Sequence, residues 1–522
     1  MVGTRTVVAT VTPTRPAAGA ELGGAARHGV LNLLGVAVAA VAGFGLNIVV
    51  TRGWSMADAG LFFAATSAFM IAYAAARLGT GIGSVYFISR YRTLGQPERI
   101  RASVLAGLLP LLVMGVLLTT VGWLFTPRIV ELTFAEPVPG AVPALRALLL
   151  FVPVAALCDF TLSACRGFGK MRPLLLIERL GRTLLQFLAV LVVAVLGLSA
   201  TTALPLAWAL PYVPAALAAV FWLARMVRRA ERSAGPDAPP PVSWRQEFVP
   251  YWRYSGPRAL SGLAQMVVQR LDIVLLGALR GLSEAALYTA ATRFLTLGQL
   301  SGQALSTAVQ HRLAEHLARD DRAAAGRLYQ AATAWLVLLA WPAYLLFASF
   351  AEPMLSLFGS GYDAGRTVTV YLALTMLVAT GCGMVDTVLN MAGKTAWTFY
   401  NALSGTVVNV VANVLLIPRY GVMGAAIAWS ASILITNLVP LVQLHRAFRL
   451  HPFGRGTLTA AGLALACFGA PSLALHAVTD PGMASLLVVA ALGGAGYAVA
   501  VWRLRGVLQL DALRALRRNR GR

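Results

Sequence analysis

Charged side chains are scarce in this sequence. They make up only 12% of the 522 residues, whereas hydrophobic residues make up 58% and the mean hydropathy is +0.72. This balance excludes a soluble globular domain and indicates a chain that crosses a membrane many times. The net charge of +23 does not indicate a nucleic-acid-binding protein, because the basic residues are spread over many loops and form no single basic module.

The sequence motifs of several enzyme classes are also missing. The chain has no Walker A sequence, no HExxH zinc motif and no GxSxG nucleophile motif. Its cysteines show neither a disulfide framework nor the spacing of metal ligands, and we interpret them as small packing residues: Cys158, Cys165, Cys382 and Cys467. We therefore expect a transporter rather than an enzyme, with no catalytic residues, no metal and no cofactor.

Long apolar runs are what the sequence has in abundance. A bilayer-spanning helix needs about 20 predominantly apolar residues, and fourteen runs of this kind follow one another along the chain. They cover roughly residues 29–51, 59–87, 103–125, 143–165, 173–197, 203–225, 257–279, 285–311, 330–351, 366–391, 396–417, 421–443, 457–478 and 482–502. The sequence therefore predicts an all-α polytopic membrane protein with 14 transmembrane helices.

The distribution of Lys and Arg predicts the orientation of these spans. When the loops are divided into two alternating sets, most basic residues fall in the set that includes both termini. The other set holds only Arg52, Arg128, Arg280, Arg366 and Arg419. Because cytoplasmic loops of membrane proteins carry the Lys/Arg excess, we expect both termini to be cytoplasmic.

The longest connection divides the spans into six, six and two. Residues 226–256 contain a Pro-rich, charged part and then an aromatic part, which predicts a cytoplasmic linker that feeds an interfacial helix. The expected organisation is a disordered cytoplasmic tail, an N-lobe, this linker, a C-lobe, two further spans and a basic cytoplasmic tail, over residues 1–28, 29–225, 226–256, 257–443, 444–502 and 503–522.

The two six-span groups resemble each other in sequence. Residues 58–69 (DAGLFFAATSAF) match residues 284–295 (EAALYTAATRFL), at the start of spans 2 and 8 respectively. Because six spans separate the two copies, both cross the membrane in the same direction. The repeat predicts two pseudo-symmetric lobes related by an axis along the membrane normal, with a substrate held between them.

Polar residues inside the spans identify a candidate binding site, because such residues rarely face lipid. At helical spacing they line one face of spans 2, 7 and 8. Arg270 is on span 7 as well, but its position on the helix points away from the other polar residues of that span. The residues expected to bind substrate in a central cavity are Tyr73, Arg77, Gln265, Gln269, Arg270, Asp272, Thr292, Arg293, Thr296, Gln299 and Gln303.

Several of these positions admit a second interpretation. Polar side chains also join transmembrane helices through hydrogen bonds, and Arg270 lies close enough to the outer end of its span to extend to the membrane surface. Asp272 is either the counter-charge of Arg270 or a helix-packing residue. Asp159 and Asp386 are isolated carboxylates within spans. Because a buried carboxyl group is able to carry a proton, they are candidates for coupling transport to H⁺ or Na⁺.

Two segments carry a resemblance to a known family. In residues 256–294 a Pro, an Asp, a Leu-Leu-Gly run and a Tyr stand at Pro257, Asp272, 275–277 and Tyr288. In residues 401–432 the pattern N…N…P.yG..GAA begins at Asn409. Both resemble the polysaccharide-exporter (Wzx-type) oligosaccharide flippases, a family of the MATE-like flippase superfamily, also called the MOP superfamily.

The resemblance implies a MATE-like V of two six-helix lobes that opens alternately to each side of the membrane. It also implies a polyprenyl-diphosphate-linked oligosaccharide as substrate, flipped to the outer leaflet for surface polysaccharide synthesis. A polysaccharide polymerase or glycosyltransferases are then expected partners, beside the lipid bilayer. A lipid II flippase, a MATE-type drug:cation antiporter and a membrane glycosyltransferase or polymerase remain alternatives.

Overall fold

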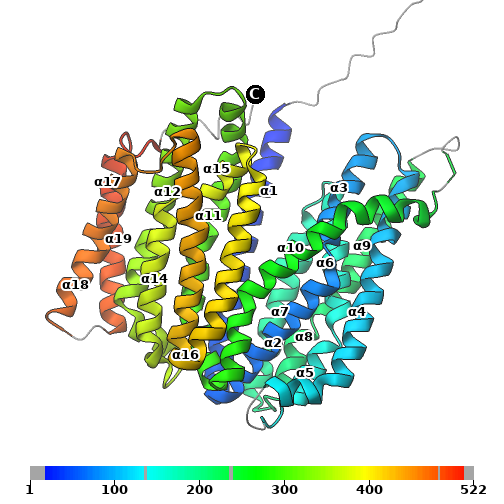
Figure 1. Cartoon of the computed structure of the whole chain (residues 1–522), viewed down its shortest axis with the longest axis horizontal. Helices are drawn as coiled ribbons and strands as arrows, with labels where there is room; N and C mark the ends of the chain where they lie inside the picture. The colour runs from blue at the N-terminus through cyan, green and yellow to red at the C-terminus, as the bar shows by residue number, and fades with distance from the viewer. Residues whose placement is uncertain (1–17, 134–137, 234–238, 241, 480–481, 511–522) are drawn as a thin grey trace, which may run out of the picture.

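The protein folds into two groups of helices. The computed structural model describes residues 18–133, 138–233, 239–240, 242–479 and 482–510, and over these ranges every regular element is a helix. Figure 1 shows that the two groups meet at one end and separate at the other, so that they form a V. This arrangement confirms the predicted pair of lobes.

The first lobe, the N-lobe, contains ten helical elements. They are α1 (Ala18–Gly53), α2 (Met56–Arg77), α3 (Thr80–Thr93), α4 (Glu98–Thr133), α5 (Ala141–Leu149), α6 (Val152–Gly167), the π-helix η1 (Leu174–Arg182), α7 (Thr183–Val195), α8 (Ala203–Ala209) and α9 (Tyr212–Arg232).

The second lobe, the C-lobe, begins with α10 and ends with α16. Its elements are α10 (Trp244–Leu279), α11 (Leu282–Ala318), α12 (Arg322–Ser349), α13 (Ala351–Leu355), η2 (Ser356–Phe358), η3 (Tyr362–Gly365), α14 (Arg366–Gly381), α15 (Val385–Met391) and α16 (Thr395–Phe448). A last group packs on the outside of this lobe, away from the N-lobe (Figure 1): α17 (Arg455–Ala464), η4 (Leu465–Gly469), α18 (Ala470–His476) and α19 (Met483–Arg503).

The fourteen predicted spans are confirmed, each by one helix, by consecutive helices or by half of a long one. Within the described ranges, eleven helices are long and apolar enough to cross a membrane. One of them, α16, is 54 residues long and joins two spans at Gly421, whose φ of 52° and ψ of −130° are not helical. These eleven helices therefore contain twelve spans. The remaining two are formed by α11 and by η1 together with α7.

Span 2 is interrupted in the middle. Between α2 and α3, Leu78 and Gly79 adopt left-handed backbone angles, with φ of 49° and 69°. A Cβ atom on Gly79 would lie 2.7 Å from the carbonyl oxygen of Ser255, so the absence of a side chain lets α10 cross close to the break. The Tyr251 hydroxyl donates a hydrogen bond to the carbonyl of Thr80, the first residue after the break, at 3.0 Å. The irregular backbone is therefore enclosed by protein, as a membrane interior requires.

Helix α10 replaces the expected separate interfacial helix. α9 continues to Arg232, and α10 begins at Trp244 after the N-cap Ser243, then runs without a break to Leu279. Figure 1 shows its first part lying across the open end of the N-lobe and the rest descending toward the closed end. Pro250 and Pro257 lie within the helix, and prolines bend helices without always ending them. The predicted boundary at residue 256 therefore falls inside one helix that contacts both lobes.

The first part of α10 is anchored to the N-lobe by a buried carboxylate. Glu247 is completely buried. Its carboxylate accepts a hydrogen bond from the Tyr91 hydroxyl and pairs with the Arg99 guanidinium at 2.7 Å. Nearby, the Trp252 indole donates to the Ala106 carbonyl at 3.0 Å. A buried charge needs such partners, so this network fixes α10 on α3 and α4.

We expect Glu247→Ala to lower the apparent melting temperature of the detergent-solubilised protein by several degrees. The substitution removes the only carboxylate that Arg99 pairs with among the described residues, and it leaves a cavity beside Tyr91. The matched control is Glu131→Ala, because Glu131 is 64% exposed and pairs only with the exposed Arg128 in the same ranges. Equal melting temperatures for the two variants would show that the network does not stabilise the fold.

Both predicted tails are shorter than expected. Residues 18–28 of the predicted N-terminal tail already belong to α1, and residues 1–17 lie outside the described residues. At the other end, Leu508 is buried, and its carbonyl accepts a hydrogen bond from the Trp335 indole at 3.0 Å. Leu508 and Leu510 therefore pack against the C-lobe, while residues 511–522 lie outside the described part of the chain.

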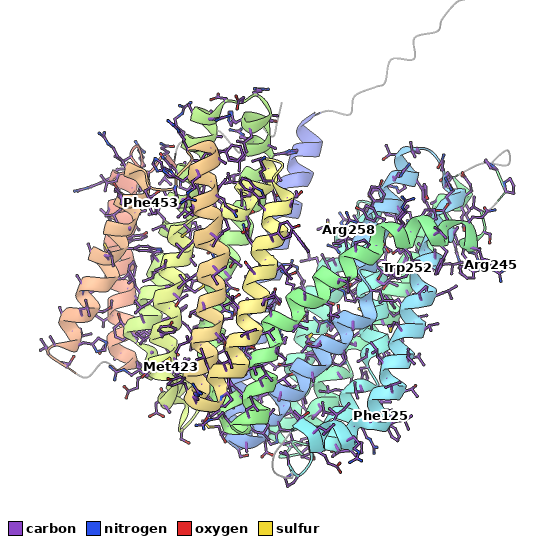
Figure 2. All side chains as sticks on the ribbon, in the orientation of Figure 1. Phe125, Arg245, Trp252, Arg258, Met423 and Phe453 are labelled. Carbon is purple, nitrogen blue, oxygen red and sulfur yellow. The ribbon has the colours of Figure 1, made fainter. Side chains whose placement is uncertain are left out.

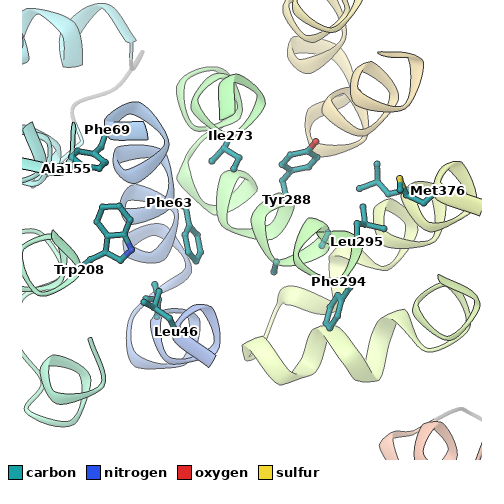
Figure 3. Close-up of a cluster of buried hydrophobic side chains, with 14 of the residues drawn as sticks. Leu46, Phe63, Phe69, Ala155, Trp208, Ile273, Tyr288, Phe294, Leu295 and Met376 are labelled. Carbon is teal, nitrogen blue, oxygen red and sulfur yellow. The ribbon is translucent and has the colours of Figure 1, made fainter. Parts of the chain in front are cut away.

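The lobes meet at the closed end of the V. Figure 3 shows part of the buried hydrophobic cluster that extends through both lobes, with Leu46, Phe63, Phe69, Ala155 and Trp208 from the N-lobe and Ile273, Tyr288, Phe294, Leu295 and Met376 from the C-lobe. The Arg52 guanidinium donates to the carbonyl oxygens of Leu357 and Ser356 at 2.7 and 3.2 Å. Gly60 of α2 lies directly against the backbone of Leu282 at the start of α11. The two repeated segments thus pack against each other.

Candidate functional site: a two-sided cavity in the C-lobe

A cavity of about 750 Å³ lies between α10, α11 and α16. Nine of the eleven residues predicted to bind substrate line it, and they are Gln265, Gln269, Arg270, Asp272, Thr292, Arg293, Thr296, Gln299 and Gln303. Tyr73 and Arg77 do not line this cavity. In this conformation the cavity is lined by residues of the C-lobe alone.

Helical spacing explains why α11 contributes one wall. Thr292, Thr296, Gln299 and Gln303 recur at alternating steps of four and three residues, so they share a face of the helix. The Thr292 hydroxyl donates to the Tyr288 carbonyl at 2.9 Å, and the Thr296 hydroxyl donates to the Arg293 carbonyl at 2.7 Å. Because both hydroxyl groups donate their hydrogen bonds within α11, their oxygens are left as acceptors facing the cavity.

Arg270 and Arg293 are the cationic side chains of the cavity. The Nε atom of each is buried and has no hydrogen-bond partner among the described residues. Neither guanidinium takes part in an ion pair within those ranges. The cavity therefore offers two half-buried guanidinium groups that no carboxylate neutralises by direct contact.

Asp272 is a packing residue in this structure. It is 3% exposed, and its carboxylate accepts a hydrogen bond from the Tyr288 hydroxyl at 2.6 Å and another from the Ile273 backbone N–H at 2.9 Å. Of the two predicted roles, counter-charge of Arg270 or helix packing, the hydrogen bonds favour the second. Asp272 ties α10 to α11 and thereby fixes the spacing of the wall that carries the two arginines.

The Arg270 side chain lines the cavity, whereas the sequence predicted that it points away from the other polar residues of its span. Its position on α10 is rotated away from Gln265 and Gln269, yet all three side chains line the same cavity. An arginine side chain is long enough to place its guanidinium well away from the direction of its Cα–Cβ bond. The interpretation in which Arg270 extends to the outer membrane surface is therefore wrong for this conformation.

The opposite wall comes from α16 and is largely apolar. Phe399, Leu403, Trp429 and Ile433 line the cavity there, accompanied by Ala402, Thr406, Ser432 and Thr436. The bend at Gly421 folds α16 back on itself, so residues 399–406 and 429–436 lie side by side. Sequence reasoning missed this wall. The residues that could have revealed it recur four positions apart, as Phe399 and Leu403 do, and Trp429 and Ile433. Such spacing is hard to recognise in spans that are apolar on every face.

Arg77 and Asp159 form a separate pair in the N-lobe. The Arg77 Nε atom lies 3.1 Å from Asp159 Oδ2, and the guanidinium stacks over the Tyr73 ring at 5.4 Å from its centroid. The two side chains are 35% and 28% exposed. Asp159 is therefore not an isolated carboxylate, as the sequence suggested, because α2 and α6 bring the oppositely charged side chains together.

Asp386 lies at the start of α15, in the break that follows α14. Gly383 in this break has a φ of 74°, and the Tyr329 hydroxyl donates to the adjacent Cys382 carbonyl at 2.5 Å. Asp386 is exposed and takes no part in the ion pairs of the described residues. It does not line the C-lobe cavity, but an accessible carboxylate beside interrupted backbone remains a candidate for ion coupling.

Comparison with known proteins agrees with this architecture. Residues 26–310 match the family of polysaccharide biosynthesis proteins, which is more than half of the chain. The chain belongs to this family. Residues 257–415, which contain most of the C-lobe, also match the MatE family. No curated protein sequence matches this member of the polysaccharide biosynthesis family.

Solved structures place this family member in the MATE-like fold. A lipid II flippase, MurJ, in an inward closed conformation, aligns with 92% of this chain and 100% of its own, with a TM-score of 0.71 and 12% identity. An inward-facing MATE multidrug resistance transporter covers 79% of this chain and 95% of its own (TM-score 0.63, 17% identity). For a MATE transporter of Vibrio cholerae the shares are 83% and 98%, with a TM-score of 0.54 and 17% identity. Such low identities establish the fold and leave the substrate open.

Proposed function

We propose that this protein is a flippase that moves a polyprenyl-diphosphate-linked oligosaccharide from the cytoplasmic to the outer leaflet of the bacterial inner membrane, for surface polysaccharide synthesis. The observation that carries the proposal is the two-sided cavity, with its pair of unneutralised guanidinium groups on one side and an apolar wall on the other. A polyprenyl diphosphate has the same two-sided chemistry.

The arginines suit a diphosphate. A guanidinium group binds two phosphate oxygens at once through parallel N–H donors and stays charged when half-buried. Arg270 and Arg293 come from adjacent helices and line one cavity, so together they are able to hold both phosphate groups. The amides of Gln265, Gln299 and Gln303 both donate and accept hydrogen bonds, as recognition of sugar hydroxyls requires.

The direction of the opening supports uptake from the cytoplasm. The V is open at the end where α1 and α10 begin (Figure 1). This is the end assigned to the loops rich in Lys and Arg, including Arg92, Arg99 and Lys170. By the positive-inside rule that end faces the cytoplasm. Both termini are then cytoplasmic, and the structure corresponds to the state that loads substrate. Release to the outer leaflet follows when the lobes close here and separate at the other end.

Coupling to H⁺ or Na⁺ is part of the proposal, with Asp159 and Asp386 as the carboxylates concerned. A carboxyl group that carries a proton must gain and lose it within each cycle, and an amide cannot do so. We expect Asp386→Asn or Asp159→Asn to flatten the dependence of transport rate on pH in proteoliposomes. A profile identical to that of the wild type would remove that residue from the coupling mechanism. Asp363→Asn is a suitable control, since Asp363 is an exposed residue of η3.

The deciding experiment is deletion of the gene followed by mass spectrometry of the polyprenyl-linked intermediates of the cell. The proposal expects a completed lipid-linked oligosaccharide to accumulate on the cytoplasmic side, which would also identify the sugar. A lipid II flippase would accumulate the peptidoglycan precursor instead. Normal intermediates with altered sensitivity to small molecules would indicate a drug antiporter. If the proposal holds, the flipped product is a substrate for a polymerase or glycosyltransferase at the outer leaflet.

A further inference from the structure

The ion pair of Arg77 and Asp159 lies within the spans of the N-lobe, yet both side chains remain accessible. Arg77 and Asp159 are 35% and 28% exposed. Arg77 stands in the last turn of α2, next to the break in the middle of span 2. Charged groups at this depth in a membrane protein do not face lipid, and they line a water-filled space instead. The pair therefore borders the cleft between the lobes.

The sequence repeat relates Arg77 to a residue of the C-lobe cavity. Residues 58–69 of α2 match residues 284–295 of α11. Continued along both helices at the same offset, the match sets Arg77 against Gln303, which lines the cavity. Lobes related by an axis along the membrane normal turn equivalent faces toward that axis. Arg77 thus faces the central space from the side opposite the cavity.

Helix α10 connects the surroundings of Arg77 with the cavity. A Cβ atom on Gly79, just after Arg77 in the chain, would lie 3.0 Å from the carbonyl carbon of Arg258. In Figure 2, α10 passes from Arg245 at the far end of the N-lobe to Arg258 and on toward the C-lobe. Ala264, which lines the cavity, follows Arg258 by less than two helical turns. Closure of the cleft therefore has only a short way to bring Arg77 to the cavity.

The contact between Arg77 and Asp159 is incomplete. The Arg77 Nε atom lies 3.1 Å from Asp159 Oδ2, but this buried oxygen takes part in no hydrogen bond among the described residues. Glu178 of the same lobe keeps a partner of its own, because its carboxylate accepts a hydrogen bond from Arg182 at 3.0 Å. A guanidinium that is open to water and only partly bonded is able to exchange its carboxylate for a phosphate.

We propose that Asp159 takes the place of the substrate's diphosphate while the protein is empty: it holds Arg77, and gives it up to the diphosphate when the lobes close around the substrate. This inference rests on the proposed function and adds a positioning residue to it. In the open V the cavity offers Arg270 and Arg293. A lipid-linked diphosphate carries two negative charges, whereas a carboxylate carries one, so it attracts Arg77 more strongly at equal distance.

The exchange links closure to the presence of substrate. Without a diphosphate, closure would separate Arg77 from Asp159 and leave the carboxylate unpaired inside the membrane, which is unfavourable. With a diphosphate in the cavity, Arg77 gains a new partner as it loses the old one. Asp159 thus opposes closure of the empty protein and competes with the substrate for the same guanidinium.

Asp159→Asn is the deciding variant. The substitution removes the competitor of the diphosphate, so we expect farnesyl diphosphate to bind the full-length protein about fivefold more tightly, as for an ion pair of this exposure. In the Arg77→Gln background the same substitution should leave the affinity unchanged. Asp320→Asn is the matched control, because Asp320 pairs with Arg322 at 2.9 Å and does not line the cavity. Equal or weaker binding by Asp159→Asn would overturn the inference, since a purely structural pair gains no affinity from its loss.

The distance between the lobes gives a second test that leaves Asp159 in place. Spin labels on cysteines introduced at Leu94 and Arg319, exposed residues that follow α3 and α11, report closure of the open end when the native cysteines are replaced. Farnesyl diphosphate should shorten this distance in the wild type. It should not do so in Arg77→Gln, although that variant keeps Arg270 and Arg293 and still binds the compound. Equal closure of the two proteins would overturn the inference, whereas a wild type that binds no farnesyl diphosphate would refute the proposed function itself.

Discussion

Arg293→Ala is expected to abolish export of the lipid-linked oligosaccharide while the protein still reaches the membrane in normal amount. Arg293 lines the cavity, and no side chain of the described residues neutralises it. Hydrogen bonds to a charged group contribute about 1.5–3 kcal/mol each, so the loss of two to a diphosphate lowers affinity by roughly 100-fold or more. Arg270→Ala is expected to behave in the same way. Transport into proteoliposomes and binding of undecaprenyl diphosphate measure the effect.

Two further variants show whether charge or shape is responsible. Arg293→Lys keeps the positive charge but loses the planar pair of donors, so we expect partial activity. Arg128→Ala is the control, because Arg128 is 78% exposed, lies at the opposite end of the membrane and pairs with Glu131. Full export by Arg293→Ala, or an equal loss in Arg128→Ala, would contradict the assignment of the diphosphate to this cavity.

Gly60→Leu is expected to block the transport cycle without touching the cavity. A Cβ atom at Gly60 would overlap the backbone carbonyl of Leu282, which cannot move aside as a flexible side chain could. Overpacking of this kind costs about 1–3 kcal/mol, occasionally more. The population in which the lobes meet at the outer end then falls roughly 5- to 150-fold. Export should fall with it, because loading from the cytoplasm needs that end closed.

The accessibility of a cysteine introduced at Ala285 reports on this conformational shift. Ala285 is completely buried where the lobes meet. In the Gly60→Leu background, we expect this cysteine to react with a membrane-impermeant thiol reagent. In the protein that keeps Gly60, we expect the same reagent to leave the cysteine unmodified. Gly43→Leu is the matched control, because a Cβ on Gly43 of α1 would meet no atom within 4 Å. Normal export with an unreactive cysteine would show that the outer end tolerates the added side chain.

Much of the candidate site follows from local periodicity. The polar residues of α11 lie on one face because helical geometry puts residues three and four apart together, so the wall from Thr292 to Gln303 was predictable. The partners of the charged side chains were not. Asp159 pairs with Arg77 across α2 and α6, and Tyr288 holds Asp272, because helix packing brings together residues that no spacing rule connects.

The sequence alone determined the number of spans, the two related lobes and the polar faces of α10 and α11, because bilayer thickness and helical repeat act on short segments. Only the tertiary structure decided that α10 serves both lobes, that Arg77 pairs with Asp159 and does not line the cavity of Arg293, and that α16 supplies the largely apolar wall. Each of these depends on contacts between residues far apart in the chain. Such contacts are set by how the helices pack, which the hydropathy of each span does not specify.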